Sequence, residues 1–209
     1  MTLEETLAQI KPLDKTAMEM AAKRWDSIAK PLHSLGKMEK LVIQIAGITG
    51  SADVSVKKRA LVPMCADNGV VEEGVTQTGQ EVTAIVAENF LSGATSACVM
   101  SRQCGTDVIP VDIGMVADTK VPTDLKIACG TANMTKEPAM SREQAVQALE
   151  AGIEMVRRLK EEGYELLATG EMGIGNTTTS SAVAAVLLDR PTEEMTGRGA
   201  GLSGDGLTR

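Results

Sequence analysis

Hydrophobic positions in the first part of the chain recur at helical spacing and show no strand-like alternation. Residues 3–10 have the pattern of a short helix. Asp14 stands where an N-cap is expected for a helix over 15–30, whose apolar residues recur every three or four positions. A third helix is expected after Ser34. The pattern therefore predicts a small helical lobe over residues 1–55.

From residue 56 onward, short apolar runs alternate with amphipathic segments. Strands are predicted over 60–65 (ALVPMC), 107–113 (DVIPVDI) and 164–168 (YELLA). Helices are predicted between and after them, over 79–92, 96–103, 141–162 and 179–188, with a helical turn at 191–195. Alternating strands and helices favour a mostly parallel, Rossmann-like α/β sheet flanked by helices over residues 56–209.

Composition excludes several classes of protein. The net charge of −7 and the scarcity of aromatic residues leave neither a basic stripe nor a stacking platform for nucleic acid. Four cysteines without a C-x-x-C pair, and the single histidine His33, argue against a metal site and against disulfides. Carboxylates, backbone amides and hydroxyls remain as the groups that could bind a ligand or take part in catalysis.

The N-terminal residues carry no apolar stretch typical of a secretory signal, and no run approaches the length of a membrane span. The expectation is therefore a cytoplasmic protein without membrane or nucleic-acid partners. No cofactor is expected.

One motif, TGEMGIGNTTTS at 169–180, joins a predicted strand to a predicted helix. Gly173 and Gly175 would let a ligand approach the backbone, and Asn176, Thr177 and Thr178 would offer amides and hydroxyls at a helix N-terminus. The motif lacks the lysine of a P-loop and the spacing of a dinucleotide fingerprint. The residues favour a phosphate or sugar-phosphate ligand, and a plain strand-to-helix turn with a threonine cap is the alternative.

Polar residues also follow the other predicted strands. In open α/β sheets, ligands bind at the carboxyl ends of the strands, so the ends at 66–69, 113–114 and 169–171 are expected to lie near one another. Glu171 is expected to face this cleft, where its carboxylate would hold a ribose or counter a cationic centre. Capping of neighbouring amides is the alternative for Glu171, and helix capping for Asp67.

Seven segments of the chain resemble those of a known protein family. They are, in order, KPLHSLGKMEKL, CADNGVVEEGV, QEVTAIVAENFLSGATS, VDIGM, CGTANMTKEPAM, GEMGIGNTTTSSAVAAVLL and GRGAGLSGDGL. Together, from about Leu13 to the end, they closely resemble the nicotinate-nucleotide:dimethylbenzimidazole phosphoribosyltransferase family. The resemblance implies a homodimer that transfers a phosphoribosyl group from nicotinate mononucleotide to 5,6-dimethylbenzimidazole or a related base. The products are α-ribazole 5′-phosphate, for the lower ligand of cobamides, and nicotinate.

The resemblance also implies roles for particular residues. Glu171 would border the active site and support catalysis, and Asp67 and Asn68 would belong to an active-site loop. Gln80 and Met172 would line the base pocket. The nucleotide phosphate would be bound by Gly173, Ile174, Gly175, Asn176, Thr177, Thr178, Gly199 and Gly201.

The chain departs from the family pattern in four places. Asn68 stands where the family usually has histidine, His33 where it usually has glycine, and Gly79 at or near a usual proline. By the resemblance, the loop 76–80 borders the base pocket, so the base preference stays open, and phenolic or purine lower ligands are alternatives. Family members are also longer, and a distal R-L-G-E-G segment supplies their general base. Residues 56–209 are accordingly expected to be a truncated nucleotide-binding domain, without turnover on its own.

Two other functions stay open at this point. The first is a catalytically inactive partner that binds nucleotide or dimerises. The second is a different sugar-phosphate enzyme with the same cleft.

Overall fold

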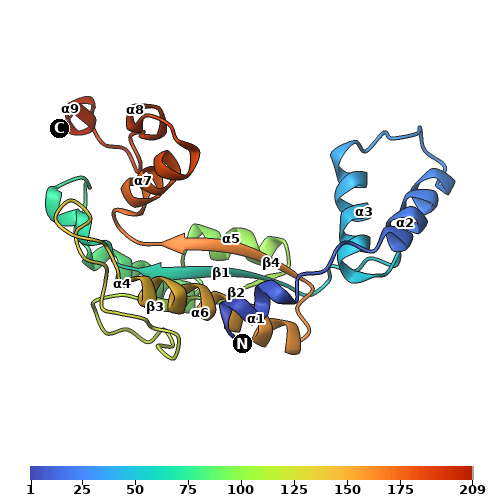
Figure 1. Cartoon of the computed structure of the whole chain (residues 1–209), viewed down its shortest axis with the longest axis horizontal. Coiled ribbons are helices and arrows are strands. Elements are labelled where there is room, and N and C mark those ends of the chain that lie inside the picture. The colour runs from blue at the N-terminus through green and yellow to red at the C-terminus, as the bar shows by residue number, and fades with distance from the viewer. Residues whose placement is uncertain (209) are drawn as a thin grey trace. The chain divides into compact units, whose positions relative to one another are not determined.

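The computed structural model describes residues 1–208. It divides into two compact units, a helical unit over residues 2–57 and a larger α/β unit that begins at Lys58 (Figure 1). Each unit has its own set of secondary-structure elements.

The helical unit contains α1 (Leu3–Ala8), α2 (Lys15–Ser27) and α3 (Lys37–Thr49). Asp14 caps α2 as predicted, because its Oδ1 accepts a hydrogen bond from the backbone N–H of Ala17 at 2.9 Å. The two longer helices pack closely, since a Cβ at Gly47 of α3 would lie 2.7 Å from Cγ of Met18. The expectation that Ser34 caps α3 is wrong: the helix begins only after Gly36, at a φ of +56°.

A buried ion pair holds the segment between α2 and α3. The Glu39 carboxylate is buried and lies 2.7 Å from Nζ of Lys30, and it also accepts a hydrogen bond from the backbone N–H of Leu35. The hydrogen bond from Lys30 is the main cause that lowers the pKa of Glu39, against the opposing effect of burial. His33 lies in the same segment in the left-handed region, at a φ of +57°. Glycine would meet no steric penalty in that conformation.

The α/β unit is organised around one central strand. β1 (Arg59–Ala66) pairs in parallel with β4 (Leu166–Met172) on one side, and with β2 (Thr106–Val108) and β3 (Val111–Gly114) on the other. The predicted parallel α/β class is therefore confirmed.

Two of the predicted strands differ in their bounds. The single strand expected over 107–113 is split around Pro110, which has no N–H to donate to a ladder. The strand expected over 164–168 instead runs from Leu166 to Met172, because β1 continues alongside it and pairs as far as Cys65 with Met172.

Helices connect and flank these strands. They are η1 (Gly69–Glu73), α4 (Glu81–Ser92), α5 (Ser96–Gln103), α6 (Arg142–Glu161), α7 (Asn176–Leu188), α8 (Thr192–Met195) and α9 (Gly204–Thr208). The capping box predicted at the start of α6 is present between Ser141 and Gln144. Helix α7 begins at Asn176, three residues before the expected Thr179.

The two faces of the sheet carry separate hydrophobic clusters. Ala60 and Val62 of β1 pack with Met155 and Leu159 of α6 on one face. Cys65 faces the other way and packs with a cluster that includes Ala87 of α4. The sheet therefore has helices on both faces, and its strand ends are free to build a site (Figure 1).

The stretch Glu81–Gln103 is long and apolar enough to cross a membrane by length and composition alone, contrary to the expectation that no run approaches such a length. In the structure it is two helices, because Gly93 ends α4 at a φ of +76° and Thr95 caps α5. Thr83 and Ala87 of α4 are fully buried, whereas only 22% of the apolar window as a whole is buried inside the protein.

Replacement of His33 by glycine tests the strain between α2 and α3. We expect His33→Gly to raise the free energy of unfolding by up to about 1 kcal/mol, because a Cβ at a left-handed φ costs roughly 1–2 kcal/mol and the added freedom of the unfolded chain offsets part of this. Urea unfolding at pH 8 would measure it. His33→Ala keeps the strain, and should be no more stable than the parent chain. An equal gain from both variants would contradict the prediction.

Candidate functional site

A cavity of about 630 Å³ lies at the carboxyl end of β4. Three chain segments build its wall: residues 75–78, residues 172–178 and residues 196–202, with Ser181, Gly206 and Leu207. The structure thus brings together Met172, the predicted phosphate-binding segment Gly173–Thr178, and the predicted glycines Gly199 and Gly201. Residues from three distant parts of the sequence share one concave surface, as expected of a ligand site.

The turn from β4 into α7 pairs some of its backbone N–H groups and leaves others without an acceptor among the described residues. The N–H of Asn176 donates to Gly173 O at 3.0 Å and the N–H of Thr178 donates to Gly175 O at 3.1 Å. Among the described residues, the N–H groups of Gly175 and Thr177 have no acceptor. These two donors stand at the N-terminus of a 13-residue helix, where the helix dipole also favours an anion.

The two glycines of this turn are required by packing. A Cβ at Gly173 would lie 2.3 Å from the carbonyl oxygen of Ala66, at the end of the neighbouring strand. A Cβ at Gly175 would lie 2.9 Å from Cγ2 of Val71, and Gly175 has a φ of +87°. The missing side chains therefore face the protein, so the fold alone requires these glycines, whether or not a ligand approaches the backbone.

Glu171 lies within β4, not after it, and pairs with Met64 of β1. It is adjacent to Met172 in the cavity wall but does not line the cavity itself. Its Oε2 accepts a hydrogen bond from Nδ2 of Asn176 at 3.0 Å. Desolvation by the surrounding protein raises the pKa of the Glu171 carboxyl, and the hydrogen bond from Asn176 partly opposes that rise.

Asp67 and Asn68 are adjacent in sequence but serve different parts of the structure. The Asp67 carboxylate is buried and its Oδ2 accepts a hydrogen bond from the N–H of Val116 at 2.7 Å, so it holds the loop after β3. Asn68 is also buried, and its Nδ2 donates to the carbonyl oxygen of Ile174 at 3.1 Å. Of the two, only Asn68 contacts the segment that lines the cavity.

Gln80, expected at the base pocket, lies behind the cavity wall. Its Nε2 donates to the backbone oxygen of Asn68 at 3.0 Å, and Gln80 does not line the cavity. The neighbouring residues Thr76, Gln77 and Thr78 line it instead.

Sequence reasoning missed several residues of the wall. Arg198 brings a positive charge to the cavity, and its backbone oxygen accepts hydrogen bonds from Gly201 and Leu202. Gln77 joins two wall segments, because its Nε2 donates to the backbone oxygen of Gly201. The arginine within GRGAGLSGDGL was a usable signal, since a cation between closely spaced glycines suits an anion. Gln77 lies in the loop 76–80, which the resemblance placed beside the base pocket, but no local pattern distinguished it within that loop.

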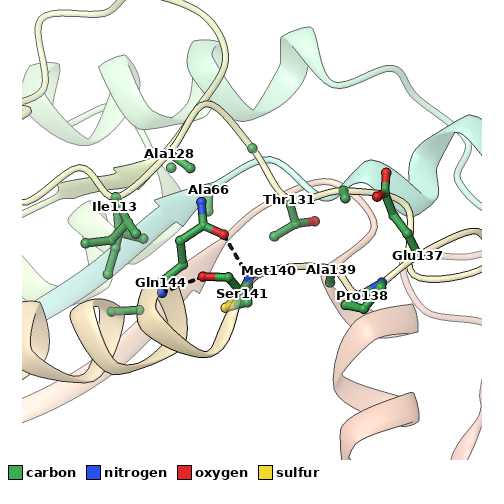
Figure 2. A pocket seen from close by; sticks show the side chains of 15 residues that line it. Ala66, Ile113, Ala128, Thr131, Glu137, Pro138, Ala139, Met140, Ser141 and Gln144 are labelled. Carbon is green, nitrogen blue, oxygen red and sulfur yellow. Dashed lines mark hydrogen bonds between the residues drawn. The ribbon is translucent and has the colours of Figure 1, made fainter.

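A second cavity, of about 550 Å³, lies between the ends of β1 and β3 and the start of α6. Its lining is mostly small and apolar, and includes Ala66, Ile113 and Met140. Figure 2 shows Gln144 and Ser141 at one side of it, joined by their capping hydrogen bonds. Thr131 and Glu137 are the other polar side chains of the lining, and the remaining lining residues are small or apolar.

The three strand ends lie near one another, as expected. The N–H of Asp67 donates to the oxygen of Gly114 at 3.0 Å, and Asn68 bonds to Ile174. The ends of β1 and β3 line the second cavity, however, and the end of β4 lines the first. Within the described residues no group of three or more His, Cys, Asp or Glu side chains is placed to hold a metal ion.

Comparison with known families matches residues 10–209 to a family model, DBI_PRT, described as phosphoribosyltransferase. A nicotinate-nucleotide–dimethylbenzimidazole phosphoribosyltransferase of Ruminiclostridium cellulolyticum is 51% identical over 209 residues, which are 99% of this chain and 59% of that protein. A protein of the same name from Clostridium tetani is 48% identical over 98% of this chain and 57% of its own length.

Solved structures show the same likeness. A crystal structure of CobT from Thermus thermophilus matches with a TM-score of 0.86 and 38% identity, over 92% of this chain and 59% of that one. This chain therefore spans about three fifths of the length of the relatives it matches.

Alanine at Gly175 tests whether packing requires glycine in the turn. We expect Gly175→Ala to lower the free energy of unfolding by roughly 2–4 kcal/mol, from the left-handed φ and the contact with Val71. Gly152 in α6 is the matched control, because a Cβ there meets nothing within 4 Å. Gly152→Ala should raise the free energy of unfolding by about 1 kcal/mol, since alanine favours a helix interior. Urea unfolding of both variants would measure the effects, and similar values would contradict this account.

Proposed function

Because the chain belongs to the nicotinate-nucleotide–dimethylbenzimidazole phosphoribosyltransferase family, we propose that its cavity binds nicotinate mononucleotide for phosphoribosyl transfer. The acceptor is 5,6-dimethylbenzimidazole or a related base. The products are α-ribazole 5′-phosphate and nicotinate, and the reaction serves the synthesis of cobamide lower ligands.

The observation that carries this proposal is the start of α7 in the cavity wall. The unpaired N–H groups of Gly175 and Thr177 and the positive end of the helix form a site for the 5′-phosphate. Thr178 lines the same cavity, and Arg198, which also lines it, adds a full positive charge. An anion is the ligand that this combination of donors and charge recognises.

The reaction exchanges one C1′–N bond for another. The bond from C1′ of the ribose to the pyridine nitrogen breaks, and its electron pair leaves with nicotinate. A ring nitrogen of the incoming base then forms the new bond to C1′, and that base loses its N–H proton to solvent or to a basic group. Phosphate anchoring would hold C1′ in place during this exchange.

Two residues beside the phosphate site suit the remaining groups. The Glu171 carboxylate, at the end of β4, would stabilise positive charge that develops at the anomeric carbon, in a supporting role. Its raised pKa means that this role requires a pH at which the carboxyl is ionised. The apolar side chain of Met172 lines the cavity next to it and would contact the flat aromatic base.

We also propose that the protein is a homodimer and is cytoplasmic, as the family resemblance implies. Large apolar side chains of the helical unit support an interface, because Met38, Leu41 and Ile48 of α3 are each more than half exposed. No nucleic acid or membrane is proposed as a partner, and the net charge of −7 accords with this.

Titration calorimetry with nicotinate mononucleotide tests the proposed site. We expect binding by the 209-residue chain, and much weaker binding of nicotinic acid riboside, which lacks the phosphate. The double variant Thr177→Ala/Thr178→Ala and the single variant Arg198→Met should each raise Kd by about tenfold or more, the loss expected for hydrogen bonds to a charged group.

Ser180→Ala is the matched control for these variants, because Ser180 lies on the same helix, is exposed, and does not line the cavity. Its Kd should equal that of the parent chain. Equal affinity for the nucleotide and the riboside, or no effect of the three wall residues, would refute a phosphate site at this cavity.

A further inference from the structure

The peptide groups on both sides of Ile174 are bound by buried side chains from other elements. The N–H of Ile174 donates to Oγ1 of Thr83 in α4 at 3.0 Å, and its carbonyl oxygen accepts from Nδ2 of Asn68 at 3.1 Å. Thr83 is fully buried and Asn68 nearly so. The middle residue of the Gly-Ile-Gly turn is thus held from two sides, by partners 91 and 106 positions away in sequence.

The contact with Asn68 sets the direction of a donor in the cavity wall. In a planar trans peptide the C=O and the next residue's N–H point in opposite directions. The Ile174 carbonyl points back to Asn68, behind the wall, so the N–H of Gly175 points away from it. That N–H is one of the two at the start of α7 without an acceptor among the described residues.

The contact with Thr83 acts on the preceding peptide by the same geometry. Because the N–H of Ile174 points to Thr83, the carbonyl of Gly173 points the other way. There it accepts the N–H of Asn176 at 3.0 Å, which closes the first turn of α7. Thr83 therefore supports the helix start on which the anion site depends.

The Asn68 carboxamide is oriented by its own partners. Its Oδ1 accepts a hydrogen bond from Oγ1 of Thr179 at 3.2 Å, so its NH₂ group is turned toward Ile174. Its backbone oxygen accepts from Gln80 Nε2 at 3.0 Å. A carboxamide satisfies both requirements at once, since one end donates and the other accepts.

We propose that Asn68 and Thr83 are positioning residues for the anion site: they fix the two peptide planes that flank Ile174 and so aim the Gly175 N–H at the bound phosphate. This inference rests on the proposed function for its ligand. The arrangement of the two peptide groups stands on the structure alone, and can be tested without a ligand.

The first experiment needs no ligand. Amide hydrogen exchange, followed by NMR, should show the Ile174 N–H protected in the parent chain. Thr83→Val has nearly the same shape but no acceptor, and should speed exchange at Ile174 by about tenfold or more. Thr83→Ser keeps the hydroxyl and should restore protection. Unchanged exchange in Thr83→Val would overturn the role of Thr83.

The second experiment measures nucleotide affinity. Asn68→Asp and Thr83→Val should each raise Kd for nicotinate mononucleotide by about tenfold, because the Gly175 donor is no longer held in direction. Ala87→Gly is the matched control: it lies one turn further along α4, is fully buried, and destabilises the same helix while leaving the hydrogen bonds from Thr83 and Asn68 to Ile174 in place. Its Kd should change less than about twofold. A comparable change in Ala87→Gly would mean that general loss of stability explains the affinities.

A third measurement locates the effect. Inorganic phosphate titrated into the labelled parent chain should shift the Gly175 amide resonance, and the shift should be lost in Asn68→Asp. If the parent chain binds neither phosphate nor the nucleotide, the proposed function fails, and the exchange experiment still decides whether Thr83 holds Ile174. If Asn68→Asp binds as the parent does with the same Gly175 shift, the positioning role of Asn68 is wrong.

Discussion

The parallel pairing of β1 with strands on both of its sides governs where the candidate site can form. It places the carboxyl ends of all strands at one edge of the sheet. It also brings the turn after β4 so close to the end of β1 that Ala66 O leaves no room for a Cβ at Gly173. The close approach of two backbones, which only glycine permits, is thus the origin of the shape of the candidate site.

Helix α7 contributes little packing of its own to this arrangement. Only Ala185 of α7 is buried among the residues that the structure describes, and Val186 and Leu187 are largely exposed. Hydrophobic burial therefore does not orient the start of the helix. The hydrogen bonds to the Gly-Ile-Gly turn do so, which gives two buried polar side chains in neighbouring elements an influence over a site that they do not line.

The Gly-Ile-Gly turn between β4 and α7 has an inner side that contacts the protein and an outer side that lines the cavity. On the inner side, Asn68 and Thr83 form hydrogen bonds with the backbone of Ile174, and Val71 packs against Gly175. The outer side keeps N–H groups without an acceptor among the described residues, in a cavity that Arg198 also lines. Donors held in advance bind an anion at a lower entropic cost than donors that must be ordered on binding. The buried hydrogen bonds therefore preorganise the N–H donors of the proposed anion site.

The amino-acid pattern was enough to predict the class of fold, the helix caps at Asp14 and Ser141, and a glycine-rich strand-to-helix turn at Gly173–Thr178. Caps, periodicity and glycine-rich turns arise from interactions between near neighbours. The pattern did not determine that β4 extends to Met172, that Asp67 and Asn68 serve different loops, or why Gly175 must be glycine. Those features depend on contacts between residues far apart in sequence, such as Asn68 and Ile174, 106 positions apart. Only the register of the assembled strands brings such residues together, and that register is a property of the tertiary structure.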